Sequence, residues 1–262
     1  MLRGKLSRFH LLIAATVFGC AIAIVFGDGP TLWVPVAVLG VLHVAVAALG
    51  VTFPQVQMFL PVLWRVPTSR KAVALTFDDG PDPAVTPALL GLLKQYGVSA
   101  TFFCIGKHVA QYPELARQIA ADGHLLGNHT YGHHHGTNFF SGVRLHDDIV
   151  RSQETIERIT GQRPYLFRPP MGLTNPRVAR VVPALGLTTV GWTVRGMDQQ
   201  AQTPEDIVRR VRRRLRPGAI ILLHDARVTG SVLLPAVERL LEELQRDGYE
   251  ICRLDKLISE TC

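Results

Sequence analysis

The sequence of 262 residues predicts an α/β barrel of about seven strands that follows a transmembrane helical hairpin. Three observations support this prediction. Two long apolar runs precede residue 54, short β-like runs alternate with helix-like runs after residue 70, and reactive side chains stand at the ends of five β-like runs. The expected division is a hairpin at 1–53, an interfacial linker at 54–70 and a main domain at 71–262.

The two apolar runs span residues 10–27 and 31–53, with only a short turn between them. The second is long enough to span a bilayer, and the first is close to the lower limit of length. A cleaved signal peptide also places basic residues before an apolar stretch. Here, however, a second apolar run follows at once, and the first exceeds the usual signal core of about 7–15 residues. We therefore expect a two-pass hairpin in the inner, cytoplasmic membrane.

Charges beside the hairpin predict its orientation. Three basic residues precede the first apolar run and three follow the second, whereas the turn carries only Asp28. Basic flanks favour the cytoplasmic side, so both chain ends and the main domain are expected in the cytoplasm. The six basic residues are Arg3, Lys5, Arg8, Arg65, Arg70 and Lys71.

The linker and the overall composition narrow the possible partners. The linker contains three prolines, and Trp64 and Arg65 are expected to anchor it at the membrane interface. The net charge is +7, with six arginines between Arg209 and Arg216. No base-reading motif accompanies them, which argues against a nucleic-acid partner. The run is either a solvated helix face or a surface attracted to membrane lipids or to a substrate phosphate. Four cysteines lack the close spacing of a disulfide framework or zinc knuckle.

The main domain alternates β-like and helix-like runs. This alternation predicts parallel strands with crossover helices, either in a barrel or in an open doubly wound sheet. A barrel is favoured because its strands all end on one face, where residues distant in sequence meet. The β-like runs are 72–77, 100–105, 125–128, 165–168, 188–194, 219–224 and 249–252, and the helix-like runs are 84–96, 113–121, 142–160, 176–185, 204–215 and 232–246.

Two carboxylates and two imidazoles point to metal chemistry. Asp78 and Asp79 follow the first β-like run, and Gly80 ends that run, so both can face one site. His129 and His133 are four residues apart, a spacing that lets both reach one ion from a helical turn. Histidines with a carboxylate suit Zn, Co, Ni or Fe better than Mg or Ca, and leave positions open for water. The neighbouring residues 134 and 135 are also histidines, but only His133 keeps the four-residue spacing.

Four motifs together resemble the NodB-homology polysaccharide deacetylases, carbohydrate esterase family 4. They lie at 76–80, 129–133, 167–172 and 221–225, in the family's order, and the resemblance covers about 71–262. It implies a distorted (β/α) barrel, a divalent metal that is often zinc, and hydrolysis of N-acetyl groups on glycans.

The resemblance also implies a role for each matching residue. Asp79, His129 and His133 would bind one divalent transition metal, with zinc first and cobalt, nickel or manganese as alternatives. Asp78 would act as the general base toward the attacking water, and Arg168 would pair with it and hold it ionised.

The remaining roles concern the leaving group and the substrate. His224 would be the general acid that protonates the leaving amine, with Asp198 orienting it. The Met171 N–H would stabilise the oxyanion, and Leu222 would line the substrate site. The chain departs from the family in having Met171 where an aromatic residue is common, and Gln199 where tryptophan often follows the aspartate.

The sequence therefore predicts a metal-dependent hydrolase that removes an N-acyl group, acetyl or formyl, from a sugar. The cytoplasmic orientation favours a membrane-lipid-linked amino sugar as substrate. One alternative places the domain outside, acting on peptidoglycan or an exported polysaccharide. Another is a catalytically inactive glycan-binding barrel, against which the complete set of Asp and His residues argues.

Overall fold

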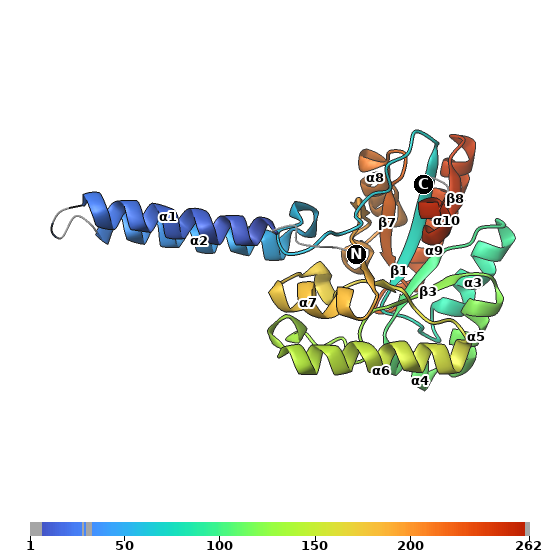
Figure 1. Cartoon of the computed structure of the whole chain (residues 1–262). Helices are drawn as coiled ribbons and strands as arrows, with labels where there is room; N and C mark the ends of the chain where they lie inside the picture. The colour runs from blue at the N-terminus through green and yellow to red at the C-terminus, as the bar shows by residue number, and fades with distance from the viewer. Residues whose placement is uncertain (1–6, 28, 30–32, 260–262) are drawn as a thin grey trace.

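The computed structural model describes residues 7–27, 29 and 33–259, and an apolar hairpin projects from an α/β domain (Figure 1). The hairpin consists of α1 (Arg8–Phe26) and α2 (Trp33–Thr52). Both helices are long and apolar enough to cross a membrane. Within these helices only Gly50 is buried. Arg3, Lys5 and Asp28, which enter the orientation prediction, lie outside the described residues.

Polar groups within the hairpin pair with each other. The Thr16 hydroxyl donates to the Leu12 carbonyl oxygen at 2.9 Å and lies 2.9 Å from His43 Nδ1 on the other helix. Such pairing is needed in a lipid environment, where no water is available to hydrogen-bond polar groups. Gly19 lets the two helices approach, since a Cβ there would lie 3.0 Å from Leu39 Cδ1.

The domain is built on an eight-stranded parallel sheet. Its strand order is β5-β4-β3-β2-β1-β7-β6, and β8 pairs with β1 outside this path. The strands are β1 (Ala72–Asp78), β2 (Thr101–Cys104), β3 (Leu125–Asn128), β4 (Leu166–Phe167), β5 (Thr188–Thr189), β6 (Val194–Arg195), β7 (Ile220–His224) and β8 (Glu250–Cys252). The predicted α/β class and distorted barrel are confirmed.

Helices connect and cover the strands. Their apolar faces pack on a core that includes Leu89, Ile119 and Leu240. The helices are α3 (Thr86–Gln95), α4 (Gly106–Gln111), α5 (Pro113–Ala121), α6 (Gly142–Thr160), α7 (Pro176–Ala184), α8 (Pro204–Arg214), α9 (Gly230–Arg246) and α10 (Leu254–Ser259). Short 3₁₀ turns lie at η2 (Pro54–Val56), η3 (Thr137–Phe139), η4 (Pro170–Gly172) and η5 (Asp198–Gln200). Helices α4 and α10 were not among the predicted runs.

The run 188–194 is not a single strand, and that prediction was wrong. It forms β5 and β6, which lie at opposite ends of the strand order. Between them the chain crosses from one edge of the sheet to the other. Leu63 bridges to Val190 after β5, and Arg65 bridges to Ala219 before β7. Residues of the 54–70 segment thus lie between the two edges, and this interruption distorts the barrel.

The 54–70 segment packs into the domain and also contacts the hairpin. Its residues Met58, Phe59 and Leu60 are buried, and Phe9 of α1 packs against the same cluster. The Phe9 N–H donates to the Met58 carbonyl oxygen at 3.0 Å. The Thr174 N–H donates to the carbonyl oxygen of Val51, near the end of α2, at 3.3 Å. These contacts fix the end of the hairpin to the domain.

Strand register brings the predicted site residues to one edge. Asp78 at the end of β1 lies opposite His224 of β7, and Asn128 of β3 lies opposite Phe167 of β4. His129 and Arg168 follow these last two residues directly. The carboxyl ends of parallel strands open on one face, so side chains from distant parts of the sequence converge there.

Candidate active site

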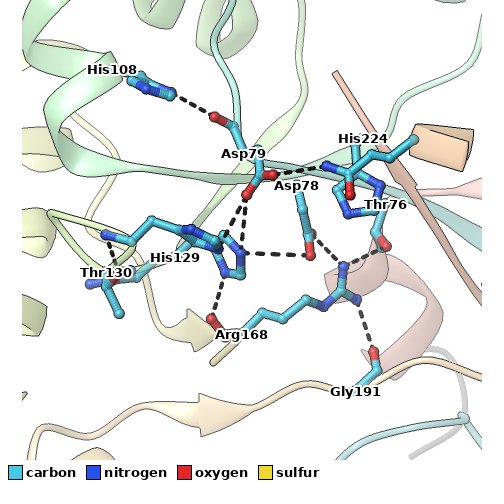
Figure 2. A network of polar contacts seen from close by, with 12 residues as sticks. Thr76, Asp78, Asp79, His108, His129, Thr130, Arg168, Gly191 and His224 are labelled. Carbon is cyan, nitrogen blue, oxygen red and sulfur yellow. Dashed lines mark hydrogen bonds and ion pairs between the residues drawn. The ribbon is translucent and has the colours of Figure 1, made fainter. Parts of the chain in front are cut away.

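A cavity of about 230 Å³ lies at the carboxyl ends of the strands. Seven of the nine predicted site residues line it, and Arg168 and Asp198 are buried next to them, each in contact with one of the seven. Figure 2 shows Asp78, Asp79, His129, Arg168 and His224 close together. The seven are Asp78, Asp79, His129, His133, Met171, Leu222 and His224.

Asp78 is held by a fully buried arginine. Arg168 donates from Nη1 to Asp78 Oδ1 at 2.7 Å and to the Thr76 hydroxyl at 2.8 Å, and from Nη2 to the Gly191 carbonyl oxygen at 2.8 Å (Figure 2). Its guanidinium also stacks 4.1 Å from the centre of the Phe103 ring. A buried charge is tolerated when it is paired and hydrogen-bonded in this way. Arg168 therefore sets the position of the Asp78 carboxylate.

Asp79, His129 and His133 form a three-donor cluster. Asp79 Oδ1 lies 3.5 Å from His129 Nε2 and 3.4 Å from His133 Nε2. The three donor atoms lie within 4.8 Å of one another. Burial raises the pKa of Asp79, but its hydrogen bond with His129 and the nearby imidazoles outweigh burial and hold that pKa well below its usual range. The carboxylate is therefore ionised at neutral pH, as a metal ligand must be.

Hydrogen bonds and burial prepare both imidazoles for a metal. His129 Nδ1 donates to the Arg168 carbonyl oxygen at 2.7 Å, which fixes the ring so that Nε2 faces the Asp79 carboxylate. Burial, followed by the charge of His129, lowers the pKa of His133 to about 3, so His133 is neutral at physiological pH. Two imidazole nitrogens and one carboxylate oxygen fit a divalent transition metal and leave coordination positions for water and substrate.

The two histidines lie on a loop, and the predicted helical turn was wrong. Thr130 and His133 both adopt positive φ. Side chains replace the helical hydrogen bonds: Asn128 Oδ1 accepts from the Thr130 N–H at 2.8 Å, and the Thr130 hydroxyl accepts from the His133 N–H at 3.1 Å. The Asp148 carboxylate of α6 accepts from the N–H groups of Tyr131 and Gly132. The four-residue spacing brings the imidazoles together, but loop hydrogen bonds position them.

His224 and Asp198 form a buried pair on the other side of the cavity. His224 Nδ1 lies 2.9 Å from Asp198 Oδ1, and the His224 backbone N–H donates to Asp198 Oδ2 at 2.6 Å. Burial lowers the pKa of His224, but the Asp198 hydrogen bond and the charges of Asp198, Asp78 and Asp79 outweigh it, so the pKa lies above its ordinary value. The ring is therefore held in a fixed orientation and favoured as imidazolium.

Met171 and Leu222 line the mouth of the cavity together with Trp192. Met171 is half exposed and has φ 55°. Gly172, which follows it, has φ 71°, and a Cβ there would lie 2.2 Å from the Trp192 ring. Only glycine satisfies both constraints. Trp192, which supplies the aromatic surface of the cavity, was not among the predicted site residues.

Three further residues support the site and were not assigned roles from the sequence. His108 of α4 lies 2.7 Å, through Nδ1, from the Asp79 carbonyl oxygen, and burial lowers the pKa of His108. Gln199 donates from Nε2 to Asp79 Oδ2 at 3.2 Å. Asp225 packs under Gly80, where a Cβ would lie 2.0 Å from its carboxylate, and burial raises the pKa of Asp225 to about 7. The signal for Gln199 was its departure from the family's tryptophan.

Comparison with known proteins identifies the family. The family model described as polysaccharide deacetylase matches residues 65–190. A peptidoglycan-N-acetylglucosamine deacetylase of Bacillus cereus is 38% identical over 199 residues, covering 75% of this chain and 92% of that protein. A chitooligosaccharide deacetylase of Azorhizobium caulinodans is 37% identical over 163 residues, covering 62% of this chain and 77% of that protein.

A solved structure matches the fold as well. It is a carbohydrate esterase family 4 pseudoenzyme from Bacillus anthracis, with TM-score 0.70 and 27% identity, covering 76% of this chain and 69% of that chain. Family membership and catalytic competence are thus separate questions, and the second depends on the residues present. The cavity of this chain holds the full Asp-His-His donor cluster. The chain therefore belongs to the polysaccharide deacetylase family, carbohydrate esterase family 4, and is a hydrolase of sugar N-acetyl amides.

Proposed function

We propose that this protein removes acetyl groups from N-acetylated amino sugars of a peptidoglycan- or chitooligosaccharide-type glycan at a membrane surface. The names of the two relatives support a glycan of this class as the substrate, rather than a single amino sugar on a lipid. They also support acetyl, rather than formyl, as the group that is removed. The observation that carries the proposal is the cluster of Asp79, His129 and His133 in one cavity with Asp78 and His224.

We propose Asp79, His129 and His133 as the ligands of one divalent metal, and zinc as that metal. Two imidazole nitrogens and one carboxylate oxygen are the donor set of many open catalytic zinc sites. When bound, such a metal makes water more acidic and polarises the acyl carbonyl. The hydrogen bonds of Arg168, His108 and Gln199 to the ligands then keep the donors in place.

Asp78 is proposed as the general base. It lies beside the metal cluster, with Oδ2 3.9 Å from His129 Nε2, while Arg168 pairs with its other oxygen. This arrangement leaves one carboxylate oxygen to accept a proton from the attacking water. Arg168 stays behind the carboxylate and acts as a positioning residue.

His224 is proposed as the general acid, with Asp198 as its positioning residue. Amide cleavage needs a proton on the leaving nitrogen, because an amide anion is a very poor leaving group. The raised pKa of His224 favours the protonated form that this step needs. The Met171 N–H is proposed to stabilise the oxyanion, and Leu222 to contact the acetyl group, because both residues line the cavity.

Acetate release from defined glycans tests the proposal. The purified full chain in detergent, supplied with Zn²⁺, is expected to release acetate from N-acetylchitooligosaccharides or soluble peptidoglycan fragments. Chelation should stop the reaction, and added metal should restore it. If the metal-bound chain released acetate from neither substrate, the result would instead support the inactive glycan-binding alternative.

Membrane orientation is a separate proposal. The basic flanks of the hairpin favour a cytoplasmic domain, whereas assembled peptidoglycan lies across the bilayer. An alkaline phosphatase, which is active only outside the cytoplasm, is therefore fused after Cys262. Inactivity of the fusion supports the cytoplasmic orientation, and strong activity supports an external domain acting on the cell wall. Cys262 lies outside the described residues.

A further inference from the structure

A second cavity, of about 710 Å³, lies between the end of α2 and helix α8. It adjoins the catalytic cavity, because Met171, Trp192 and Arg195 line both. It is also lined by Thr52 and Phe53, where the apolar hairpin ends. A ligand in this cavity therefore lies next to both the hairpin end and the catalytic cavity.

Five arginines line this cavity, which we name the arginine groove, and none of its lining residues is acidic. The side chains of Arg213 and Arg214 are exposed and make no hydrogen bond or ion pair with any part of the chain that the structure describes. The five are Arg195, Arg210, Arg213, Arg214 and Arg216. Two of them lie over aromatic rings, Arg195 at 5.9 Å from Trp192 and Arg216 at 5.4 Å from Trp64.

Two other arginines of α8 provide an internal contrast. Arg209 pairs with Asp206 at 2.5 Å, and Arg212 pairs with Asp247 at 2.6 Å. One helix thus carries arginines that are paired with carboxylates and arginines that are not. Several like charges in one groove repel each other and destabilise the folded state, and a bound anion removes this repulsion. The unpaired arginines of α8 therefore have the composition of an anion site.

The chemistry of the groove selects the anion. Arginine binds phosphate oxygens through two parallel hydrogen bonds, and several guanidiniums together suit a group that carries more than one negative charge. A diphosphate meets this requirement better than a single carboxylate. The adjoining hairpin end suits an apolar chain, and the adjoining catalytic cavity suits a sugar.

We propose that the arginine groove binds the diphosphate of a lipid-linked glycan while an N-acetyl sugar of the same molecule occupies the catalytic cavity. This inference rests on the proposed deacetylase function and narrows its substrate to a glycan that is still attached to its lipid carrier. It applies on either side of the membrane, because the groove, the cavity and the hairpin end are neighbours in the same chain.

Two substrates and two matched variants test the proposal. The substrates are an N-acetylglucosamine oligomer and the same oligomer bearing a short polyprenyl diphosphate at its reducing end. The groove variant is Arg213→Gln with Arg214→Gln, and the control, Arg209→Gln with Arg212→Gln, removes the same charge from the arginines of α8 that are paired with carboxylates. The ratio of kcat/KM for the lipid-linked over the free oligomer should fall about tenfold or more in the groove variant. In the control variant this ratio should stay at the value of the unsubstituted chain. An equal ratio in both variants would overturn the proposal.

A binding measurement separates this proposal from the deacetylase function. Inorganic pyrophosphate is titrated into the full chain in detergent with a chelator present, so that no catalytic metal can bind it. Binding that weakens about tenfold in the groove variant and not in the control supports the groove, even if no acetate is released from any substrate. No binding by the unsubstituted chain would overturn it. Membrane phospholipid is the other source of phosphate, so displacement of pyrophosphate by phosphatidylglycerol in the micelles would also overturn it.

Discussion

The hairpin and the catalytic cavity depart from the usual distribution of side chains in opposite directions. The hairpin leaves large apolar side chains exposed, with Phe18 at 69% and Phe26 at 81%. The cavity region buries charged ones, with Arg168 at 0% and Asp78 at 4%. Folded domains normally do the reverse. The hairpin has the composition that suits lipid, whereas the cavity region pairs its buried charges with opposite charges.

The two regions also differ in how they satisfy their polar groups. The hairpin has few, and Thr16 and His43 pair between the helices. The cavity region has many, and Arg168 alone makes hydrogen bonds with Asp78, Thr76 and Gly191. Removing one member of such a buried ion pair typically costs about 3–5 kcal/mol. Substitutions in the cavity should therefore have larger effects than substitutions in the hairpin.

The largest expected effect is at the metal cluster. Asp79→Asn removes the only negative charge among the three proposed ligands, and so it should abolish both metal binding and acetate release. Metal content per chain is measured by elemental analysis after dialysis, next to activity. An Asp79→Asn variant that retained full metal content would exclude this residue as a ligand.

Asp78→Asn should have a different signature from its neighbour. The amide cannot accept a proton from water, so turnover should fall by about 10²–10⁴-fold, the usual contribution of a general base. Metal content should remain near that of the unsubstituted chain, since Asp78 is not a proposed ligand. If the two aspartate variants exchanged these signatures, the roles assigned to them would have to be exchanged.

Matched arginine substitutions compare an exposed apolar residue of the hairpin with an exposed apolar residue of the α/β domain. Val17 in α1 and Val143 in α6 are both exposed, at 62% and 73%. Val17→Arg would place a charge near the middle of a membrane-spanning helix, at a cost of about 2.5–3.5 kcal/mol for insertion. Val143→Arg faces water and should cost almost nothing. The fraction of each variant that resists alkaline extraction from membranes reports insertion, and equal fractions would argue against a spanning α1.

Sequence patterns predicted most of the fold because its elements have clear periodicity and boundaries. The helices α5 and α6 begin and end at the predicted residues, and so does strand β3. The run 188–194 failed because its apolar composition does not reveal that β5 and β6 pair with different strands. Helix α4 was missed because its six residues are too few to show a helical period.

For the candidate site, the sequence likewise predicted the main residues but not their tertiary contacts. The motifs identified seven of the residues that line the cavity, but not Trp192 and not the hydrogen bonds that hold the seven in place. Asp148 supports the histidine loop from 16 and 17 residues away, and Gln199 reaches Asp79 across 120 residues. Such contacts depend on tertiary packing. The arginine groove likewise required the structure, because the run 209–216 does not show which arginines lack a carboxylate partner.

The smallest expected effect is a shift of pH dependence at the His224–Asp198 pair. Because the pKa of His224 is raised, the pairing contributes stability that is fully present below its unfolded pKa of about 6.5 and is lost as pH rises through the folded value. The acid form should persist over the same range, so turnover should decline at alkaline pH. Asp198→Asn removes the charge and should move this decline to lower pH. Asp206→Asn, which removes a partly exposed carboxylate paired with Arg209, is the control and should leave the decline in place. Profiles of kcat against pH decide the matter, and an alkaline limb that is identical in both variants would mean that Asp198 does not set the protonation of His224.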